Sequence, residues 1–422
     1  MSELSYLEKL MDGVEVEWLP LSKVFNLRNG YTPSKTKKEF WANGDIPWFR
    51  MDDIRENGRI LGNSLQKISS CAVKGGKLFP ENSILISTSA TIGEHALITV
   101  PHLANQRFTC LALKESYADC FDIKFLFYYC FSLAEWCRKN TTMSSFASVD
   151  MDGFKKFLIP RPCPDNPEKS LAIQSEIVRI LDKFTALTAE LTAELNMRKK
   201  QYNYYRDQLL SFDEEQEKPI YLEKLLDGVE VEWKLLGDAS FFEIANNGRK
   251  PVKSSLRIAG KTPYYGANNI QDYVDGYTHD GEYVLIAEDG SASLENYSIQ
   301  YATGKFWANN HVHVVRGKTR VNSRFLFHYL HIVNFIPFLT GGVRAKLTKG
   351  QLIEISVPIP CPDNTEKSLA IQAEIVRILD KFDTLTNSIT EGLPREIELR
   401  QKQYEYYRDL LFSFPKPETV SN

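Results

Sequence analysis

The chain has 422 residues, which exceeds one ordinary domain and suggests two or three at about 150 residues each. Hydrophobic residues make up 43% and charged residues 25%, close to globular averages, which excludes wholesale disorder. The net charge is −3, from 51 Lys and Arg against 54 Asp and Glu. This balance excludes a protein that binds nucleic acid through bulk positive charge alone, but it leaves room for a local basic face.

The cysteines and the apolar segments indicate the compartment. The seven cysteines are odd in number and contain no Cys-x-x-Cys pair, which argues against a disulfide framework and a zinc ribbon and favours a reducing environment. The apolar segment 125–131 is far shorter than the roughly 20 residues that span a bilayer, and segment 325–339 is interrupted by polar residues and a proline. The N-terminus lacks the pattern of a signal peptide. We therefore expect a soluble, cytoplasmic protein without membrane contact.

The strongest signal is internal repetition. Four blocks recur nearly unchanged and in the same order: 6–18 as 221–233, 163–174 as 361–372, 177–184 as 375–382, and 201–207 as 403–409. A period near 200 residues indicates two whole domains rather than a solenoid. The segments 22–158 and 237–356 between the blocks show little resemblance to each other. The chain therefore consists of a variable module followed by a shared helix, and this pair of segments occurs twice.

The shared blocks predict two long helices. Asn166 can cap the first helix, with Pro167 at its first position. Apolar residues then recur at spacings of three and four, which is a heptad seam. Its members that we expect to form the spacer and to dock partners are Leu181, Phe184, Leu191, Leu195, Tyr205, Leu379, Phe382, Ile389 and Tyr407. Four extra residues around 392–395 predict a kink or break in the second helix.

Each helix would extend about 40 residues, or ~60 Å. Because one chain carries both copies, an antiparallel pair within the chain, acting as a spacer, is our main interpretation. An oligomerising coiled coil is the alternative.

No motif predicts that the chain is an enzyme. There is no Pro-Pro pair for an amino-methyltransferase motif and no Gly-x-Gly-x-Gly loop, and the two Gly-Lys-Thr triplets lack the preceding Walker glycine. His311 and His313 would face the same way on a strand, but no further ligand lies close in sequence, so we predict no metal site. A self-sufficient methyltransferase or nuclease is therefore disfavoured.

Positive charge is local. Basic residues without any acidic neighbour occupy 247–261 and 341–351, and a looser basic set occupies 35–59. Such glycine-flanked loops suit close approach to phosphates, although a solvated loop is the plainer alternative. The basic residues that we predict to bind DNA are Lys35, Lys37, Arg50, Arg249, Lys250, Lys253, Arg344 and Lys346.

Recognition of bases needs side chains that present paired donors or acceptors, such as Arg for guanine and Asn or Gln for adenine. Asn in Gly266–Asn269 is equally consistent with a turn. The candidates for contact with bases or phosphates are Thr88, Ser89, Thr91, Asn105, Gln106, Arg107, Asn268, Asn269, Asn309, Asn310 and His311.

The alternation of variable modules with helical repeats resembles the specificity subunit of type I restriction–modification enzymes. The blocks 6–18 and 187–212 most resemble the type IC subfamily. Within the modules, segments similar to target recognition domains are 30–34, 44–48, 87–93, 105–107, 263–267, 286–290 and 309–311. These segments add Thr32, Ser34 and Tyr265 to the predicted DNA-binding residues.

The resemblance implies an α+β fold with two mixed α/β target recognition domains joined by an antiparallel coiled coil in a pseudo-twofold repeat. The domains we predict are 1–160 and 214–358 for recognition, 161–213 and 359–415 for the spacer helices, and 416–422 for a tail. Such a subunit would recognise a bipartite, asymmetric site in double-stranded DNA.

The same resemblance implies partners. Two modification subunits would methylate adenine and two restriction subunits would cleave. S-adenosylmethionine, ATP and Mg²⁺ would be used by those partners, and this chain would need no cofactor. The alternative is a coiled-coil scaffold whose modules bind protein or carbohydrate.

The tandem unit 188–191 and 192–195 generates a prediction. One unit lengthens a helix by ~6 Å, which is nearly two base-pair steps. Deletion of 192–195 should therefore change the spacing between the two half-sites in a map of the methylated sequence. An unchanged spacing would leave the two units as ordinary helical turns.

Overall fold

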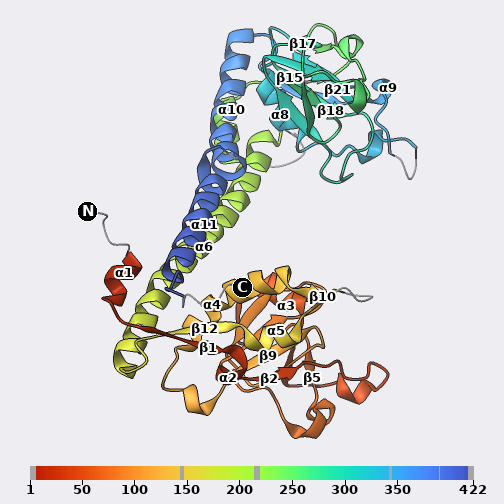
Figure 1. The fold of residues 1–422 in the computed structure, drawn as a ribbon. Helices are drawn as coiled ribbons and strands as arrows, with labels where there is room; N and C mark the ends of the chain where they lie inside the picture. Colours follow the sequence, from red (N-terminus) through yellow and green to blue (C-terminus); the bar gives the residue numbers. More distant parts are fainter. Residues whose placement is uncertain (1–5, 143–146, 213–218, 342–344, 389, 417–422) are drawn as a thin grey trace. The chain divides into compact units, whose positions relative to one another are not determined.

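The computed structural model describes residues 6–142, 147–212, 219–341, 345–388 and 390–416 (Figure 1). The chain forms two compact units. The first unit contains residues 1–189 and 398–422, and the second contains residues 190–397. Within the described residues, no helix is both long and apolar enough to cross a membrane.

The first module is a central sheet between a helix and a smaller sheet. The central sheet has the order β2 (Phe25–Asn29), β9 (Phe108–Leu113), β6 (Ser83–Ser87), β7 (His95–Ile98) and β4 (Ile60–Leu61). The smaller sheet has the order β5 (Lys67–Ile68), β3 (Ile46–Phe49) and β8 (Leu103–Ala104).

Side chains of β6 alternate between the two faces of the central sheet. Ile84 and Ile86 join the core that contains α4 (Ile123–Lys139), whereas Leu85 joins the core of the smaller sheet. Short elements complete the module: α1 (Tyr6–Met11), β1 (Val16–Pro20), α2 (Leu21–Val24), α3 (Met51–Asn57), β10 (Thr141–Thr142), β11 (Ser148–Val149), α5 (Met151–Lys156) and β12 (Leu158–Pro162).

The second module repeats this arrangement. Its first sheet has the order β14 (Phe242–Ile244), β21 (Val312–Gly317), β18 (Tyr283–Ala287) and β19 (Ile299–Ala302), and α8 (Ser323–Leu330) packs on it. Its second sheet has the order β16 (Ile270–Val274), β15 (Ala259–Tyr265), β20 (Lys305–Ala308) and β17 (His279–Asp280). The remaining elements are α7 (Ile220–Leu226), β13 (Val231–Leu235), α9 (Lys349–Leu352) and β22 (Ser356–Pro360).

The two modules share a fold despite their unlike sequences. The order β2-β9-β6-β7 matches β14-β21-β18-β19, strand for strand in sequence order. In both modules the second sheet contains one parallel pair, β3 with β8 in the first module and β15 with β20 in the second. An antiparallel pair leads into the helical region in each copy, β1 with β12 and β13 with β22. The sequence repeat therefore covers only part of a more extensive structural repeat.

The shared blocks form the predicted helices. α6 extends from Pro167 to Leu210 over 44 residues, and the Asn166 side chain caps it by accepting a hydrogen bond from the Lys169 amide at 3.0 Å. The second copy consists of α10 (Thr365–Asn387) and α11 (Gly392–Leu411). The predicted break is confirmed, and it lies between the end of α10 and the start of α11. Pro394 does not interrupt α11, because it lies in the first turn of that helix, where a missing amide hydrogen costs little.

Gly392 explains why α11 can begin where it does. Its φ is +78°, and a Cβ at this position would lie 2.4 Å from the Thr384 carbonyl oxygen. A side chain is therefore excluded both by backbone conformation and by space.

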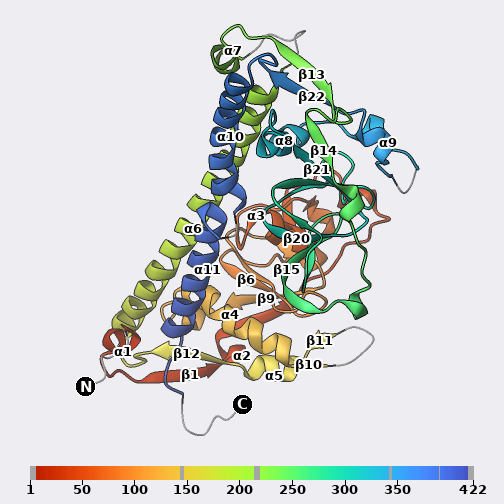
Figure 2. The ribbon, with the colours of Figure 1, turned by 90° about the horizontal axis from the view of Figure 1, so that it is seen from above.

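Within each unit the helices run antiparallel (Figures 1 and 2). In the first unit, Phe184 of α6 stacks on Tyr407 of α11, with ring centroids 5.4 Å apart. In the second unit, Phe382 of α10 stacks on Tyr205 of α6 at 5.5 Å. The predicted antiparallel pairing is confirmed in each unit, and the two stacks use corresponding residues of the repeat.

The other predicted seam residues differ in burial. Leu181 and Leu379 are fully buried, and Leu191 and Leu195 are half-buried. Ile389 is outside the described residues.

The chain's last described segment belongs to the first unit. Phe412 and Phe414 are buried in the core that contains α4, where both contact the ring of Phe125. The Trp18 indole donates a hydrogen bond to the Pro415 carbonyl at 3.0 Å, across 397 positions of sequence. The first module is therefore completed by residues from beyond the second.

A buried glutamine joins each module to its helix. The Gln174 side chain accepts from the Asp122 amide and donates to the Cys120 carbonyl, both at 2.9 Å. The Gln372 side chain accepts from the Asn322 amide at 2.8 Å and donates to the Arg320 carbonyl at 3.1 Å.

Both glutamines are fully buried. Asp122 and Asn322 cap α4 and α8, so each glutamine fixes the start of the helix that supports its sheet.

Replacing Gln372 by Ala should destabilise the second unit by about 2 kcal/mol, because a buried amide and a buried carbonyl lose their partners. The measurement is the free energy of unfolding in urea. Gln271→Ala, at an exposed position of the same unit, is the matched control and should change stability by less than about 0.5 kcal/mol. Equal effects of the two substitutions would contradict the structural role of Gln372.

Candidate nucleic-acid interface

In the first module, two turns at one end of the central sheet are bonded together. The turn 88–94 connects β6 with β7, and the turn 105–107 connects β8 with β9. The Thr88 amide donates to the Arg107 carbonyl at 2.9 Å, and the Val149 amide donates to the Thr88 carbonyl at 3.0 Å. These bonds hold the predicted residues of both turns together at this end of the central sheet.

An open cleft of about 790 Å³ lies beside the turn 105–107. Its lining residues are Thr32, Lys35, Lys38, Trp41, Ala42, Trp48, Arg50, Met51, Asp52, Arg55, Gln66, Asn105, Gln106 and Arg107. Basic side chains outnumber the single carboxylate, so the cleft attracts anions. Trp41 and Trp48 contact each other edge to face, with ring centroids 5.1 Å apart, and form an apolar wall.

The cleft brings together six of the predicted residues: Thr32, Lys35, Arg50, Asn105, Gln106 and Arg107. Ser34 and Lys37 lie in the segment that enters it, and Lys37 covers the Phe40 ring at 5.0 Å. Thr88, Ser89 and Thr91 lie instead in the neighbouring turn 88–94. Sequence reasoning missed Gln66, which follows no recognisable motif.

Several of these side chains already have partners. The Thr32 hydroxyl donates to the Gln106 side chain, and Asn105 accepts from the Arg107 amide at 3.0 Å. The Arg50 guanidinium lies 3.8 Å from Asp52, but its buried Nε has no partner among the described residues. Asn105 therefore shapes the turn, whereas Arg50 and Arg107 retain donors.

The second module has the same loop arrangement. The Glu288 amide donates to the His311 carbonyl at 2.8 Å, and the Leu347 amide donates to the Glu288 carbonyl at 2.8 Å. His311 precedes β21, whereas His313 is buried within it, so the two rings do not share one face of a strand as the sequence suggested. Among the described residues, no group of three or more His, Cys, Asp or Glu side chains could hold a metal ion.

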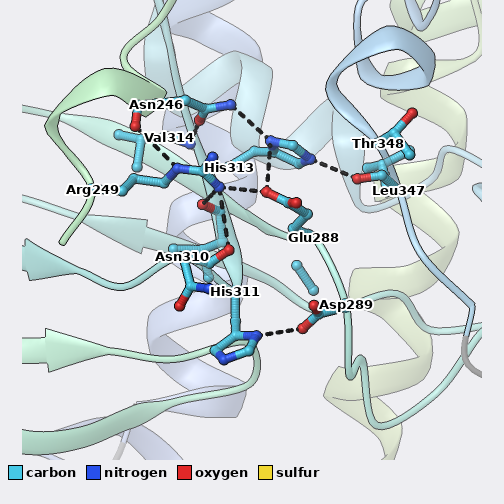
Figure 3. A network of polar contacts seen from close by, with 12 residues as sticks. Asn246, Arg249, Glu288, Asp289, Asn310, His311, His313, Val314, Leu347 and Thr348 are labelled. Atoms are coloured by element: carbon cyan, nitrogen blue, oxygen red, sulfur yellow. Dashed lines mark hydrogen bonds and ion pairs between the residues drawn. The ribbon is translucent and has the colours of Figure 1, made fainter. Parts of the chain in front are cut away.

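Glu288 is the centre of a polar network (Figure 3). Its carboxylate lies 2.5 Å from Arg249 and 3.0 Å from Lys346. Burial opposes ionisation of Glu288, but the hydrogen bonds from Arg249 and Lys346 outweigh it, and the pKa of the carboxyl lies below its usual value. The network therefore keeps the Glu288 carboxylate charged, in contact with Arg249 and Lys346.

His313 extends the network. Its Nε2 lies 2.7 Å from the Leu347 carbonyl, to which it donates, and its Nδ1 accepts from the Asn246 amide at 2.9 Å. Burial lowers the pKa of His313, so the ring stays neutral at neutral pH. Arg249 also donates to the carbonyl of Val312 at 2.9 Å. Arg249, predicted as a loop cation for phosphate, thus makes its contacts inside the module.

The remaining predicted residues of this module lie around the network. Lys250 and Lys253 are exposed, and Tyr265 is half-buried against Phe306, with ring centroids 5.8 Å apart. Burial raises the pKa of Tyr265.

Asn268 bridges the turn after β18, donating to the Gly290 carbonyl at 2.8 Å and accepting from the Ala292 amide at 2.9 Å. The Asn269 carbonyl accepts from the Gly266 amide at 2.9 Å, and Asn310 is exposed. Arg344 is outside the described residues.

The family model for the type I restriction modification DNA specificity domain matches residues 13–198 and, a second time, residues 230–399. The chain belongs to this family. Each match covers one module with its shared helix, so this type I specificity protein contains the family's domain twice.

Its relatives include two Escherichia coli proteins. The chain is 66% identical to the type I restriction enzyme EcoprrI specificity subunit over 400 residues, which cover 93% of each protein. It is 38% identical to the type I restriction enzyme EcoR124I/EcoR124II specificity subunit, with full coverage of both. Among solved structures, the type I restriction-modification system S subunit from M. genitalium matches with a TM-score of 0.56 at 18% identity, covering 99% of each chain, which shows a shared fold.

Replacing Glu288 by Gln should destabilise the second unit by about 2 to 3 kcal/mol, because Arg249 and Lys346 lose their charged partner at a half-buried position. The loss of stability is measured by comparing the thermal unfolding of the Glu288→Gln protein with that of the unaltered protein. Glu295→Gln makes the same chemical change at an exposed residue and is the matched control. A Glu288→Gln protein as stable as the control would show that the network contributes nothing to folding.

Proposed function

We propose that this chain is the DNA sequence-specificity subunit of a type I restriction–modification complex. It recognises a bipartite, asymmetric sequence in double-stranded DNA, and each module recognises one half-site. The observation that carries this proposal is one shared helical frame combined with two modules of the same fold but unlike loops. Equal scaffolds with different loops suit one task applied to two different sequences.

The geometry supports a positional role. In each module the loops gather at one end of the central sheet, and in the first module they border an open, basic cleft of about 790 Å³. Phosphate contacts supply affinity, and loop side chains supply specificity. The subunit therefore determines which sequence is held while modification subunits methylate the target adenines, which requires extrusion of the base from the duplex.

The proposal assigns the chemistry to partners. Two modification subunits use S-adenosylmethionine, and two restriction subunits use ATP and Mg²⁺, in the cytoplasm. The specificity subunit itself is non-catalytic, consistent with the lack of methyltransferase and Walker motifs in its sequence. Exposed aromatic residues of the helices, Tyr204 and Tyr406 at corresponding positions of the repeat, support two equivalent docking surfaces.

The test is expression of the chain with a type IC modification subunit in a bacterial strain free of DNA methylation. Methyladenine is then mapped across the genome. We expect a single split motif, methylated on both strands, and no methylation from the modification subunit alone.

Two other outcomes would contradict the proposal or part of it. Co-purification of the two proteins without any new methylation would favour a scaffold whose modules bind protein or carbohydrate. Failure to co-purify would contradict the type IC assignment and would require a modification subunit of another subfamily.

A further inference from the structure

The two modules can be compared residue by residue through their backbone hydrogen bonds. In the first module the Thr88 amide donates to the Arg107 carbonyl at 2.9 Å, and in the second the Glu288 amide donates to the His311 carbonyl at 2.8 Å. In the first module the bond joins the turn after β6 to the turn before β9, and in the second it joins the turn after β18 to the turn before β21. Position 107 therefore corresponds to position 311, and each follows an Ala-Asn pair, at 104–105 and 308–309.

The turns that carry these two positions are built in the same way. The Asn105 side chain accepts from the Arg107 amide at 3.0 Å, and the Asn309 side chain accepts from the His311 amide at 2.8 Å. An asparagine that bonds the backbone two residues ahead forms a compact, self-supported turn. In both modules this turn exposes the side chain of the second residue after the asparagine.

A triad of polar residues in or just after three neighbouring strands lies next to each turn. The triads occupy corresponding positions: Asn29, Thr109 and Thr88 in the first module, and Asn246, His313 and Glu288 in the second. In the first, the Thr109 hydroxyl lies 3.0 Å from the Asn29 oxygen and 3.1 Å from the Thr88 hydroxyl. A contact residue on such a supported turn is held in place before the ligand arrives.

The exposed side chains differ in what they offer. Arg107 makes no side-chain hydrogen bond or ion pair with the residues that the structure describes, and it lies at the edge of the basic cleft. A free guanidinium presents a fork of donors that matches the two major-groove acceptors of guanine, O6 and N7.

His311 offers the opposite polarity. Its Nδ1 lies 2.6 Å from the Asp289 carboxylate, which as an acceptor requires the hydrogen on Nδ1 (Figure 3). In the neutral ring Nε2 is then an acceptor, directed away from Asp289. An acceptor matches the exocyclic amino group that adenine or cytosine presents in the major groove.

We propose that positions 107 and 311 are equivalent specificity-determining positions of the two modules. Arg107 contacts a guanine in the half-site of the first module. His311, oriented by Asp289 as a positioning residue, contacts an amino-bearing base, adenine or cytosine, in the half-site of the second. This inference rests on the proposed function.

The first test compares Arg107→Gln with Arg138→Gln, an exposed arginine on α4 of the same unit that does not line the cleft. The purified complex with the modification subunit selects DNA from a library randomised at one base pair at a time, starting from the split motif of the unaltered chain. Arg107→Gln should lower the preference for guanine at one base pair of one half-site about 10- to 100-fold. Arg138→Gln should leave every preference unchanged.

The second test uses His311→Arg and Asp289→Asn in the same selection. His311→Arg should shift one base pair of the other half-site towards guanine. Asp289→Asn should relax the preference at that same base pair, because the tautomer of His311 is no longer fixed. A variant that only damages folding would instead weaken binding to all library members equally, without a change at a single base pair.

The outcomes separate this inference from the proposed function. A split motif in the unaltered complex, combined with base preferences that Arg107→Gln and His311→Arg leave intact, would overturn the inference and preserve the function. Absence of any sequence preference in the unaltered complex would overturn the function and the inference with it. Changes confined to one base pair in each half-site would establish both positions.

Discussion

The buried hydrogen bonds of Gln174 and Gln372 are the constraint on which the rest of the structure depends. Each glutamine satisfies one backbone amide and one carbonyl at the start of the helix that supports a recognition sheet. Both lie in the repeated block of sequence, one turn after Ser170 and Ser368, to which they also donate. Because an unsatisfied buried amide or carbonyl costs more than a single hydrogen bond contributes, a placement of the module that breaks these bonds is disfavoured. Identical residues thus attach modules that otherwise differ in sequence.

The division between constant and variable parts continues inside each module. The order of four strands in the first sheet, a parallel pair in the second sheet and the asparagine turns are the same in both copies, whereas the side chains exposed on the turns differ. Even the supporting triads differ in chemistry: hydroxyls and an amide in the first module, and an ionised carboxylate with a neutral imidazole in the second. The fold therefore tolerates different polar solutions at the same positions, provided that each buried group has a partner.

The sequence predicted the repeat, the antiparallel helices, the Asn166 cap and the break before α11, because these depend on periodicity and local backbone chemistry. It did not predict that the unlike modules share a fold, since the correspondence lies in backbone hydrogen bonds that impose no particular side chain. At the candidate interface, Arg50 and Arg107 were predicted as loop residues and do line one cleft. Arg249 was predicted in the same way, but its partner Glu288 lies 39 residues away, so its ion pair left no trace in the local pattern. Whether the predicted residues contact DNA stays a prediction.

The discontinuity of the first unit has a consequence for how the protein is made. Its core contains Phe412 and Phe414, so residues 1–189 cannot complete their packing until the segment from 398 onwards has left the ribosome. The second unit is continuous in sequence and can close earlier, at least over its own 190–397. During synthesis, residues 1–189 therefore keep an incomplete apolar core while residues 190–397 can already fold. This order is the reverse of the usual N-to-C order of domain folding. For that interval, α4 and its surroundings present a surface on which chaperones can act.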